Sequence, residues 1–295
     1  MSFCTKLWSY FSLLKPRVTF LVLFTALCGV VLSSYSTESF SAFSVLVALL
    51  CIYCGSGGAG AINMWYDRDI DSIMSRTKTR PIPSGAVSST EAIVFALTLC
   101  FFSVALIFVF VNPTSAALLA VAIFYYAVIY TMWLKRKTVQ NIVIGGAAGA
   151  FPPVIGWSAV TGEISIDSIT LFCIIFFWTP PHFWALALKN SSEYKSAGVP
   201  MLPVVHGNQK TKEQILIYSV ILFGICLLSC FTLNLGFFYI ISSLALNTIF
   251  LLQAIWLYKD ESRCMDMFRF SVIYLFLLFG CMVFDRLFFA PLNLF

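Results

Sequence analysis

Charged residues are scarce in this sequence of 295 residues: Asp, Glu, Lys and Arg make up 11% of it, whereas 60% is hydrophobic. Soluble domains carry about a quarter charged residues, so an ordinary soluble globule is excluded. The sequence also lacks a low-complexity segment and any polar stretch long enough for a separate soluble domain. We therefore expect residues 1–295 to form a single integral membrane domain.

We also expect no removable targeting signal. The segment from Met1 to Arg17 has no small-residue cleavage site after a short apolar core, and it is too brief for an arginine-rich transit peptide. We therefore expect the first hydrophobic run to remain in the mature protein.

Long apolar runs, by contrast, are plentiful. A helix that crosses a bilayer needs about 17 to 25 predominantly apolar residues. Such runs predict an all-α, polytopic membrane protein with nine transmembrane helices, at roughly 18–35, 42–62, 91–111, 115–132, 139–158, 168–188, 214–233, 236–257 and 269–288. The loops after the second and sixth helices are long, about 28 and 25 residues, and loops of that length are usually functional or disordered.

The few basic residues are segregated to one side of this topology. The N-terminus, the loops after helices 2, 4, 6 and 8 and the start of helix 9 hold every Lys and Arg except Arg286. The opposite loops contain Glu38, Glu163 and Asp167 instead. The positive-inside rule then places the N-terminus and the two long polar loops in the cytoplasm, and the C-terminus outside. The net charge of +5 thus reflects topology rather than nucleic-acid binding.

The ten cysteines are scattered, mostly within the predicted helices. Cys51 and Cys54 have the C-x-x-C spacing but no second pair of ligands, so packing is favoured over metal or redox use.

The richest cluster of charge follows the second helix, where residues 63–71 read Asn-Met-Trp-Tyr-Asp-Arg-Asp-Ile-Asp. Asn63, Asp67 and Asp71 recur every fourth residue, so on a helix they drift by only about 40° per step and share one face. Mg²⁺ typically takes one or two carboxylates and completes its coordination with phosphate oxygens and water. These three residues are therefore our candidate catalytic and metal-binding residues.

A basic loop follows at once, because residues 75–85 read Ser-Arg-Thr-Lys-Thr-Arg-Pro-Ile-Pro-Ser-Gly. Arg76, Lys78 and Arg80 are the candidates for binding the phosphate groups of a substrate that the metal also holds. The alternative is that the acidic residues are solvated helix caps and the basic ones only a topology signal. Three oxygen ligands on one face followed by three cations favour a functional site.

A second cluster lies in and after the sixth helix, which contains Thr-Pro-Pro-His-Phe-Trp at 179–184. Pro180 and Pro181 are expected to bend or break the helix, and broken helices at membrane depth usually line a cavity. On a continuing helix, His182, Lys189 and Glu193 would return to within about 20° of one face.

Structural explanations compete with function in this second cluster. A lone histidine is more often a satisfied structural residue, and His182 could simply bond a backbone carbonyl freed by the prolines. Its place inside a span beside a proline pair makes function an equal candidate. His206 lies in a predicted loop, and the structural explanation is favoured for it.

The motifs together resemble a known family. The Asn63-x-x-x-Asp67-x-x-x-Asp71 pattern is similar to the first aspartate-rich motif of the intramembrane aromatic prenyltransferases. The segments 63–71, 76–85, 179–184 and 197–205 resemble one branch, the protohaem IX farnesyltransferases or haem O synthases. The likeness runs from Lys15-Pro-Arg to the ninth helix, and four long motifs in order are highly specific.

The resemblance implies transfer of a farnesyl group from farnesyl diphosphate to a vinyl group of haem b, with release of diphosphate. By residue match, Asn63, Asp67 and Asp71 would hold the Mg²⁺ diphosphate, with Arg76, Lys78 and Arg80 as its basic loop. It further implies a bacterial inner membrane, or alternatively a mitochondrial one, and association with a downstream haem-modifying enzyme or terminal oxidase.

One stretch departs from the family's pattern. The second motif is generally Asp-x-x-x-Asp, but here the comparable stretch is Lys189-Asn-Ser-Ser-Glu193, followed by Tyr194. The difference puts a second metal ion in doubt, and it is consistent with a substrate that brings its own charge. His182, Lys189, Glu193 and Tyr194 are therefore the candidates for the haem site or second motif. The rival functions are a sister prenyltransferase acting on a quinone or chlorin precursor and, from another class, a transporter or haem-handling chaperone.

Overall fold

The computed structural model describes residues 3–36 and 40–289, so Glu38 lies outside the described residues. Within these ranges every regular element is a helix, which confirms the predicted all-α class. The α-helices are α1 (Phe3–Leu13), α2 (Pro16–Ser33), α3 (Ala42–Tyr66), α4 (Arg68–Ile73), α5 (Ser89–Phe110), α6 (Pro113–Phe124), α7 (Asn141–Thr161), α8 (Ile166–Lys189), α9 (Ser191–Ser196), α10 (Leu202–Thr232), α11 (Phe237–Lys259) and α12 (Cys264–Phe288). Two 3₁₀ turns, η1 (Ser34–Ser36) and η3 (Glu261–Arg263), and a π-helix, η2 (Tyr125–Leu134), complete the fold.

Nine helical segments of the described ranges are long and apolar enough to cross a membrane, which is the number predicted. The fourth combines α6 with η2. The predicted start of the seventh was wrong: α10 begins at Leu202 rather than near residue 214, with a kink at Gly207, where φ is 81°. The polar residues before the apolar run stay helical, and hydropathy cannot detect a helical extension that leaves the apolar layer.

Helix α1 was not predicted, because it is too short and too polar to span a bilayer. It packs Leu13 into the core and exposes Trp8, and the Nζ atom of Lys6 pairs with Glu91 at 2.7 Å. That ion pair ties α1 to the N-terminal end of α5.

The spans form a closed ring in chain order. Each span contacts the next, and α12 contacts α2 to close the ring, while α2 and α7 also contact each other across it. Most of the apolar stretch of α7 and of α8 is buried, whereas only a small part of α5 and of the α6–η2 span is buried. The exposed side chains of α5 include Phe101, Phe108 and Val109, which suit a lipid-facing surface.

Two glycines allow the close approach of α2 and α7. A Cβ atom on Gly156 would lie 2.1 Å from the Ala26 carbonyl oxygen, and one on Gly29 would lie 2.1 Å from that of Pro153. Backbone-to-backbone contact of this kind is typical of membrane helices, in which small residues let two helices approach.

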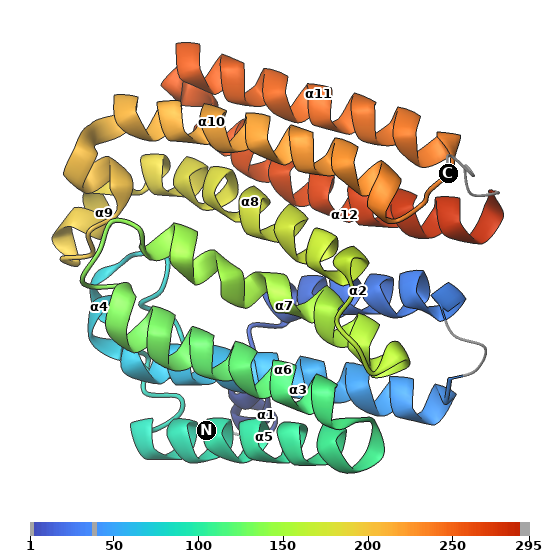
Figure 1. The fold of residues 1–295 in the computed structure, drawn as a ribbon. Coiled ribbons are helices and arrows are strands. Elements are labelled where there is room, and N and C mark those ends of the chain that lie inside the picture. The colour runs from blue at the N-terminus through green and yellow to red at the C-terminus, as the bar shows by residue number, and fades with distance from the viewer. Residues whose placement is uncertain (1–2, 37–39, 290–295) are drawn as a thin grey trace.

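The loops after the even-numbered spans gather at one end of the bundle. Helices α4 and α9 lie together there, at the left of Figure 1, and α12 ends at the opposite end. The Asn208 side chain donates to Glu261 at 2.6 Å, which joins the first part of α10 to η3 at the same end. The fold therefore brings the polar loops of both predicted clusters to this end of the bundle, which we call the basic end because its loops hold most of the Lys and Arg residues.

We predict that Gly156→Ala destabilises the protein by about 1–3 kcal/mol, because the added methyl group must push the α2 backbone away. Gly149→Ala is the matched control on the same helix, since nothing lies within 4 Å of its added Cβ. Thermal unfolding in detergent should show a lower midpoint for Gly156→Ala and an unchanged or higher one for Gly149→Ala. Equal midpoints for both variants would contradict the close α2–α7 contact.

Candidate active site

Asp67 stands at the junction of α3 and α4. It ends α3 with φ −85° and ψ 6°, yet the amide of Asp67 donates to the Asn63 carbonyl and the amide of Asp71 to the Asp67 carbonyl, at 3.0 and 2.8 Å. The helical spacing therefore continues through the junction. The Asn63 Nδ2 atom donates to Asp67 Oδ2 at 2.8 Å. The side chains of Asn63 and Asp67 are therefore in direct contact, as their spacing predicted.

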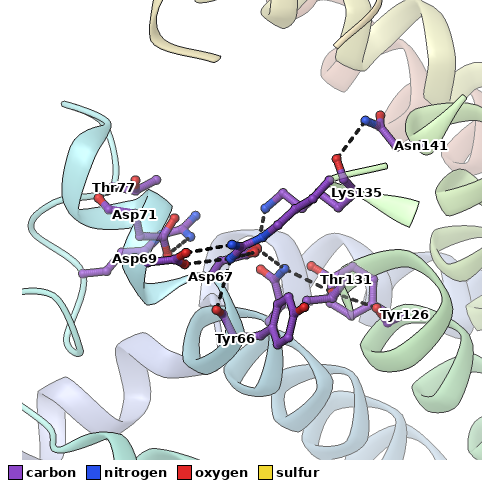
Figure 2. A network of polar contacts seen from close by, with 12 residues as sticks. Tyr66, Asp67, Asp69, Asp71, Thr77, Tyr126, Thr131, Lys135 and Asn141 are labelled. Carbon is purple, nitrogen blue, oxygen red and sulfur yellow. Dashed lines mark hydrogen bonds and ion pairs between the residues drawn. The ribbon is translucent and has the colours of Figure 1, made fainter. Parts of the chain in front are cut away.

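The Asp67 carboxylate is fully buried and held by cations from the loop after η2. Lys135 pairs with Oδ2, and Arg136 reaches Oδ1 at 3.3 Å. In Figure 2 Lys135 extends toward Asp67, while Asp69 and Asp71 project from α4. A buried carboxylate is stable only when it is paired and hydrogen-bonded, so this loop holds the motif in place.

Arg136 also binds Asp69, which is largely exposed. Two guanidinium nitrogens donate to the two Asp69 oxygens at 2.7 Å each. The hydrogen bonding lowers the pKa of Asp69 to about 2, and the same contact raises the pKa of Arg136. The forked contact fixes the loop after η2 against α4.

Asp71 pairs with the third cation of the basic loop. The Arg80 guanidinium donates to Asp71 Oδ2 at 2.6 Å, and the Thr77 hydroxyl donates to the Asp71 carbonyl oxygen at 2.9 Å. The loop thus folds back over α4. Arg80 is half-buried, whereas Arg76 and Lys78 are exposed.

Lys15 reaches the same cluster from the N-terminal end of α2. Its Nζ atom donates to Asn63 Oδ1 at 2.7 Å and to the Tyr126 hydroxyl at 3.4 Å. Burial, together with the charges of Arg80 and Lys135, lowers the pKa of Lys15 to about 7. The charges of Asp67 and Asp71 oppose this lowering, so Lys15 is surrounded by charges of both signs.

The π-helix η2 supplies the wall of this cluster. The Lys135 amide bonds to the Tyr130 carbonyl at 2.8 Å, five residues back, and the Thr131 hydroxyl accepts from Asn63 at 3.2 Å. Tyr126 and Tyr130 stack at 5.6 Å between ring centroids, beside Lys15. A π-helical segment is rare and is frequently found at functional sites.

The segment after α8 meets the basic loop. The Ser75 hydroxyl donates to Glu193 Oε1, and the Arg76 side chain interacts with that of Tyr194. Burial raises the pKa of Tyr194, and Arg76 opposes this rise. The other Glu193 oxygen, Oε2, is buried without a partner. The two polar loops expected from the sequence therefore touch each other.

His182 lies deeper, about 10 Å along α8 from Lys189. Its ring is stacked between Trp178 and Phe268, with centroids 4.4 and 4.6 Å away. The Nδ1 atom is 2.6 Å from the Ser271 hydroxyl of α12. The alternative in which His182 bonds a freed backbone carbonyl is therefore wrong, because its partner is a side chain.

Of the bend or break expected at Pro180 and Pro181, the break does not occur, because α8 continues through both prolines to Lys189. One expectation for α8 was wrong. The helix ends at Lys189 before Glu193, so His182, Lys189 and Glu193 do not line one continuous helical face. His182 contacts α12, Lys189 is exposed, and Glu193 contacts the basic loop.

The donor set suits a magnesium ion that shares its coordination with a phosphate. No cluster of three or more His, Cys, Asp or Glu side chains able to hold a metal occurs in the described ranges. Asn63, Asp67 and Asp71 supply an amide and two carboxylates, which is what Mg²⁺ takes when substrate oxygens complete its shell. Lys15, Lys135 and Arg80 already place cationic nitrogens on these oxygens.

Several site residues were not found by sequence reasoning. Lys15, Lys135 and Arg136 were counted only as topology charges, and Tyr126, Thr131 and Ser271 only as residues of apolar spans. The sequence offered little indication of their role, because they come from the start of α2, from η2 and the loop after it, and from α12, and no local spacing links them to Asp67 or His182. Only the fold brings them together.

The comparisons with known proteins agree with this geometry. The UbiA prenyltransferase family matches residues 22–284. A protoheme IX farnesyltransferase of Neorickettsia sennetsu is 57% identical over 94% of this chain and 92% of its own length. One from Rhodopseudomonas palustris is 51% identical over 94% and 89%.

The fold is also similar to solved structures of low sequence identity. A structure of digeranylgeranylglyceryl phosphate synthase has a TM-score of 0.79 at 18% identity, covering 95% of this chain and 98% of the other. A UbiA homolog from Archaeoglobus fulgidus bound to DMAPP and Mg²⁺ has a TM-score of 0.67 at 17% identity, covering 93% and 99%. With these matches and the paired Asn63–Asp67 motif, the chain belongs to the UbiA prenyltransferase family.

Proposed function

We propose that the chain transfers a farnesyl group from farnesyl diphosphate to a vinyl group of haem b, forming haem O and diphosphate. The observation that carries the proposal is the identity of about half or more to curated protoheme IX farnesyltransferases over 94% of the chain. The buried charge cluster at Asp67 supports the diphosphate half of the reaction, and His182 supports the haem half.

The cations around Asn63, Asp67 and Asp71 suit a diphosphate leaving group. When bound, Mg²⁺ would neutralise the charge that grows as the allylic carbon–oxygen bond breaks. Arg80 and Lys135, which pair with Asp71 and Asp67, can turn from these carboxylates to the diphosphate, and Lys15 can turn from the Asn63 amide oxygen. When the substrate binds, ion pairs within the protein are therefore replaced by ion pairs with the diphosphate.

The carbon chemistry needs a dry, electron-rich pocket. The farnesyl carbon loses its bond to diphosphate and bonds the terminal vinyl carbon, and water adds to the cation left beside the porphyrin and releases a proton. The stacked faces of Tyr126 and Tyr130, next to the charge cluster, can stabilise an allylic cation and shield it from water.

We also propose an orientation in a bacterial inner membrane with the basic end and the N-terminus in the cytoplasm. The end that carries α4 and α9 holds the basic loops, which the positive-inside rule retains in the cytoplasm.

Expression in bacteria that lack haem O synthase tests the proposed function. We expect haem O, identified by mass spectrometry of extracted pigments, with the wild-type chain and none with Asp67→Ala at equal membrane abundance. A prenylated quinone or chlorin in place of haem O would favour a sister transferase. Purified protein that releases no diphosphate from farnesyl diphosphate in the presence of Mg²⁺ would favour transport.

We predict that Asp71→Asn lowers haem O formation about a hundredfold or more, because it removes a carboxylate from the metal site. Glu213→Gln is the control, since Glu213 is a partly exposed carboxylate of α10 that pairs with the neighbouring Lys210 rather than with a residue of the Asp67 cluster. Titration with Mg²⁺ in the presence of farnesyl diphosphate should show weaker binding only for Asp71→Asn. Similar losses in both variants would contradict a specific metal role.

We predict that His182→Ala abolishes haem O formation and weakens haem b binding by at least about tenfold, as loss of an axial imidazole would. Farnesyl diphosphate binding should be unchanged, because His182 makes no contact with the Asp67 cluster. The Soret band during haem titration reports the first effect. An unchanged Soret band and haem affinity would remove His182 from the haem site.

A further inference from the structure

The Ser271 side chain sets the direction of the hydrogen bond to His182. Its hydroxyl oxygen lies 2.6 Å from the Phe268 carbonyl oxygen and 2.6 Å from His182 Nδ1. A serine hydroxyl has a single proton, and a carbonyl oxygen can only accept. If that proton went to His182, two acceptor oxygens would face each other at 2.6 Å with no proton between them.

Both contacts are satisfied in one arrangement only. The Ser271 hydroxyl donates to the Phe268 carbonyl, and Nδ1–H of His182 donates to the Ser271 oxygen. In a neutral imidazole the other nitrogen, Nε2, then carries the lone pair. The hydrogen-bond network of Ser271 thus assigns the tautomer, which the position of the imidazole ring alone would not do.

The surroundings leave only that nitrogen for a ligand. Trp178 and Phe268 stack on the two faces of the ring at interplanar angles of 18° and 24°. The Trp178 Nε1 atom donates to the Ser271 carbonyl oxygen at 2.9 Å, so Ser271 holds both rings. Nδ1 is thus occupied by Ser271 and both ring faces are covered, while 8% of the His182 surface remains accessible.

We infer that Ser271 is a positioning residue that fixes His182 as its Nδ1–H tautomer and presents Nε2 to the iron of the acceptor porphyrin. The inference rests on the proposed function for the identity of the acceptor. A hydrogen bond from the distal nitrogen of a metal-bound histidine fixes the ring and raises its basicity. Ser271 thereby acts on the iron through His182 without touching it.

Haem titration of the purified full-length protein in detergent tests this role. We expect Ser271→Ala to weaken ferric haem b binding by about tenfold, while Ser271→Thr, which keeps the hydroxyl, restores it. Ser219→Ala is the matched control, because Ser219 is a buried serine whose hydroxyl donates to a carbonyl of its own helix at 2.7 Å. Farnesyl diphosphate binding should be unchanged in all three variants.

The iron–imidazole stretching frequency of the ferrous protein, measured by resonance Raman, distinguishes positioning from a structural role. Loss of the Nδ1–H bond should lower this frequency in Ser271→Ala and leave it unchanged in Ser219→Ala. Should Ser271→Ala fail to fold, Ser271→Cys keeps the volume but is a weak acceptor and should show the same shift. If Ser271→Ala and Ser271→Cys keep the wild-type haem affinity and stretching frequency while His182→Ala binds haem weakly, the inference about Ser271 is overturned and the proposed function is not. Unchanged haem binding in His182→Ala would overturn the haem site and, with it, this role of Ser271.

Discussion

The Asp67 carboxylate at the α3–α4 junction is the group on which the rest of the site depends. It has no exposed surface, and an isolated ionised carboxylate in such a place would be strongly unfavourable. Its stability therefore requires Lys135 and Arg136 from the loop after η2. Those contacts fix the π-helix against α3, and the π-helix in turn places Thr131 and the tyrosine pair beside Asn63.

The same charges explain how a site for an anionic substrate can exist before the substrate arrives. Several cations in one place would repel each other, and the lowered pKa of Lys15 shows that repulsion together with burial. The three aspartates hold these cations in defined positions by pairing with them. Binding of a metal and a diphosphate adds charges of both signs, so the pairs can rearrange with little change in net charge.

The sequence predicted the elements with a strong local signal and missed those that depend on distant contacts. The nine spans follow from hydrophobic length, and the Asn63–Asp67 convergence follows from helical spacing, so both were predicted correctly. The shared face of His182 and Glu193 was wrong, because the helix ends at Lys189 between them. Lys135 and Ser271 could not be assigned, since each acts on a residue far away in the chain.

The two halves of the proposed site, at Asp67 and at His182, are held by different kinds of interaction. The Asp67 cluster lies at the end of the bundle, where a charged substrate can keep part of its hydration and the internal ion pairs can exchange. His182 lies about two turns deeper among apolar rings, where a charged partner would be costly and a neutral imidazole is favoured. A neutral ring needs only one hydrogen bond to define its tautomer, and Ser271 supplies it without adding a charge. Distance along the bundle from this end thus separates the half built from ion pairs from the half built from hydroxyl and aromatic contacts.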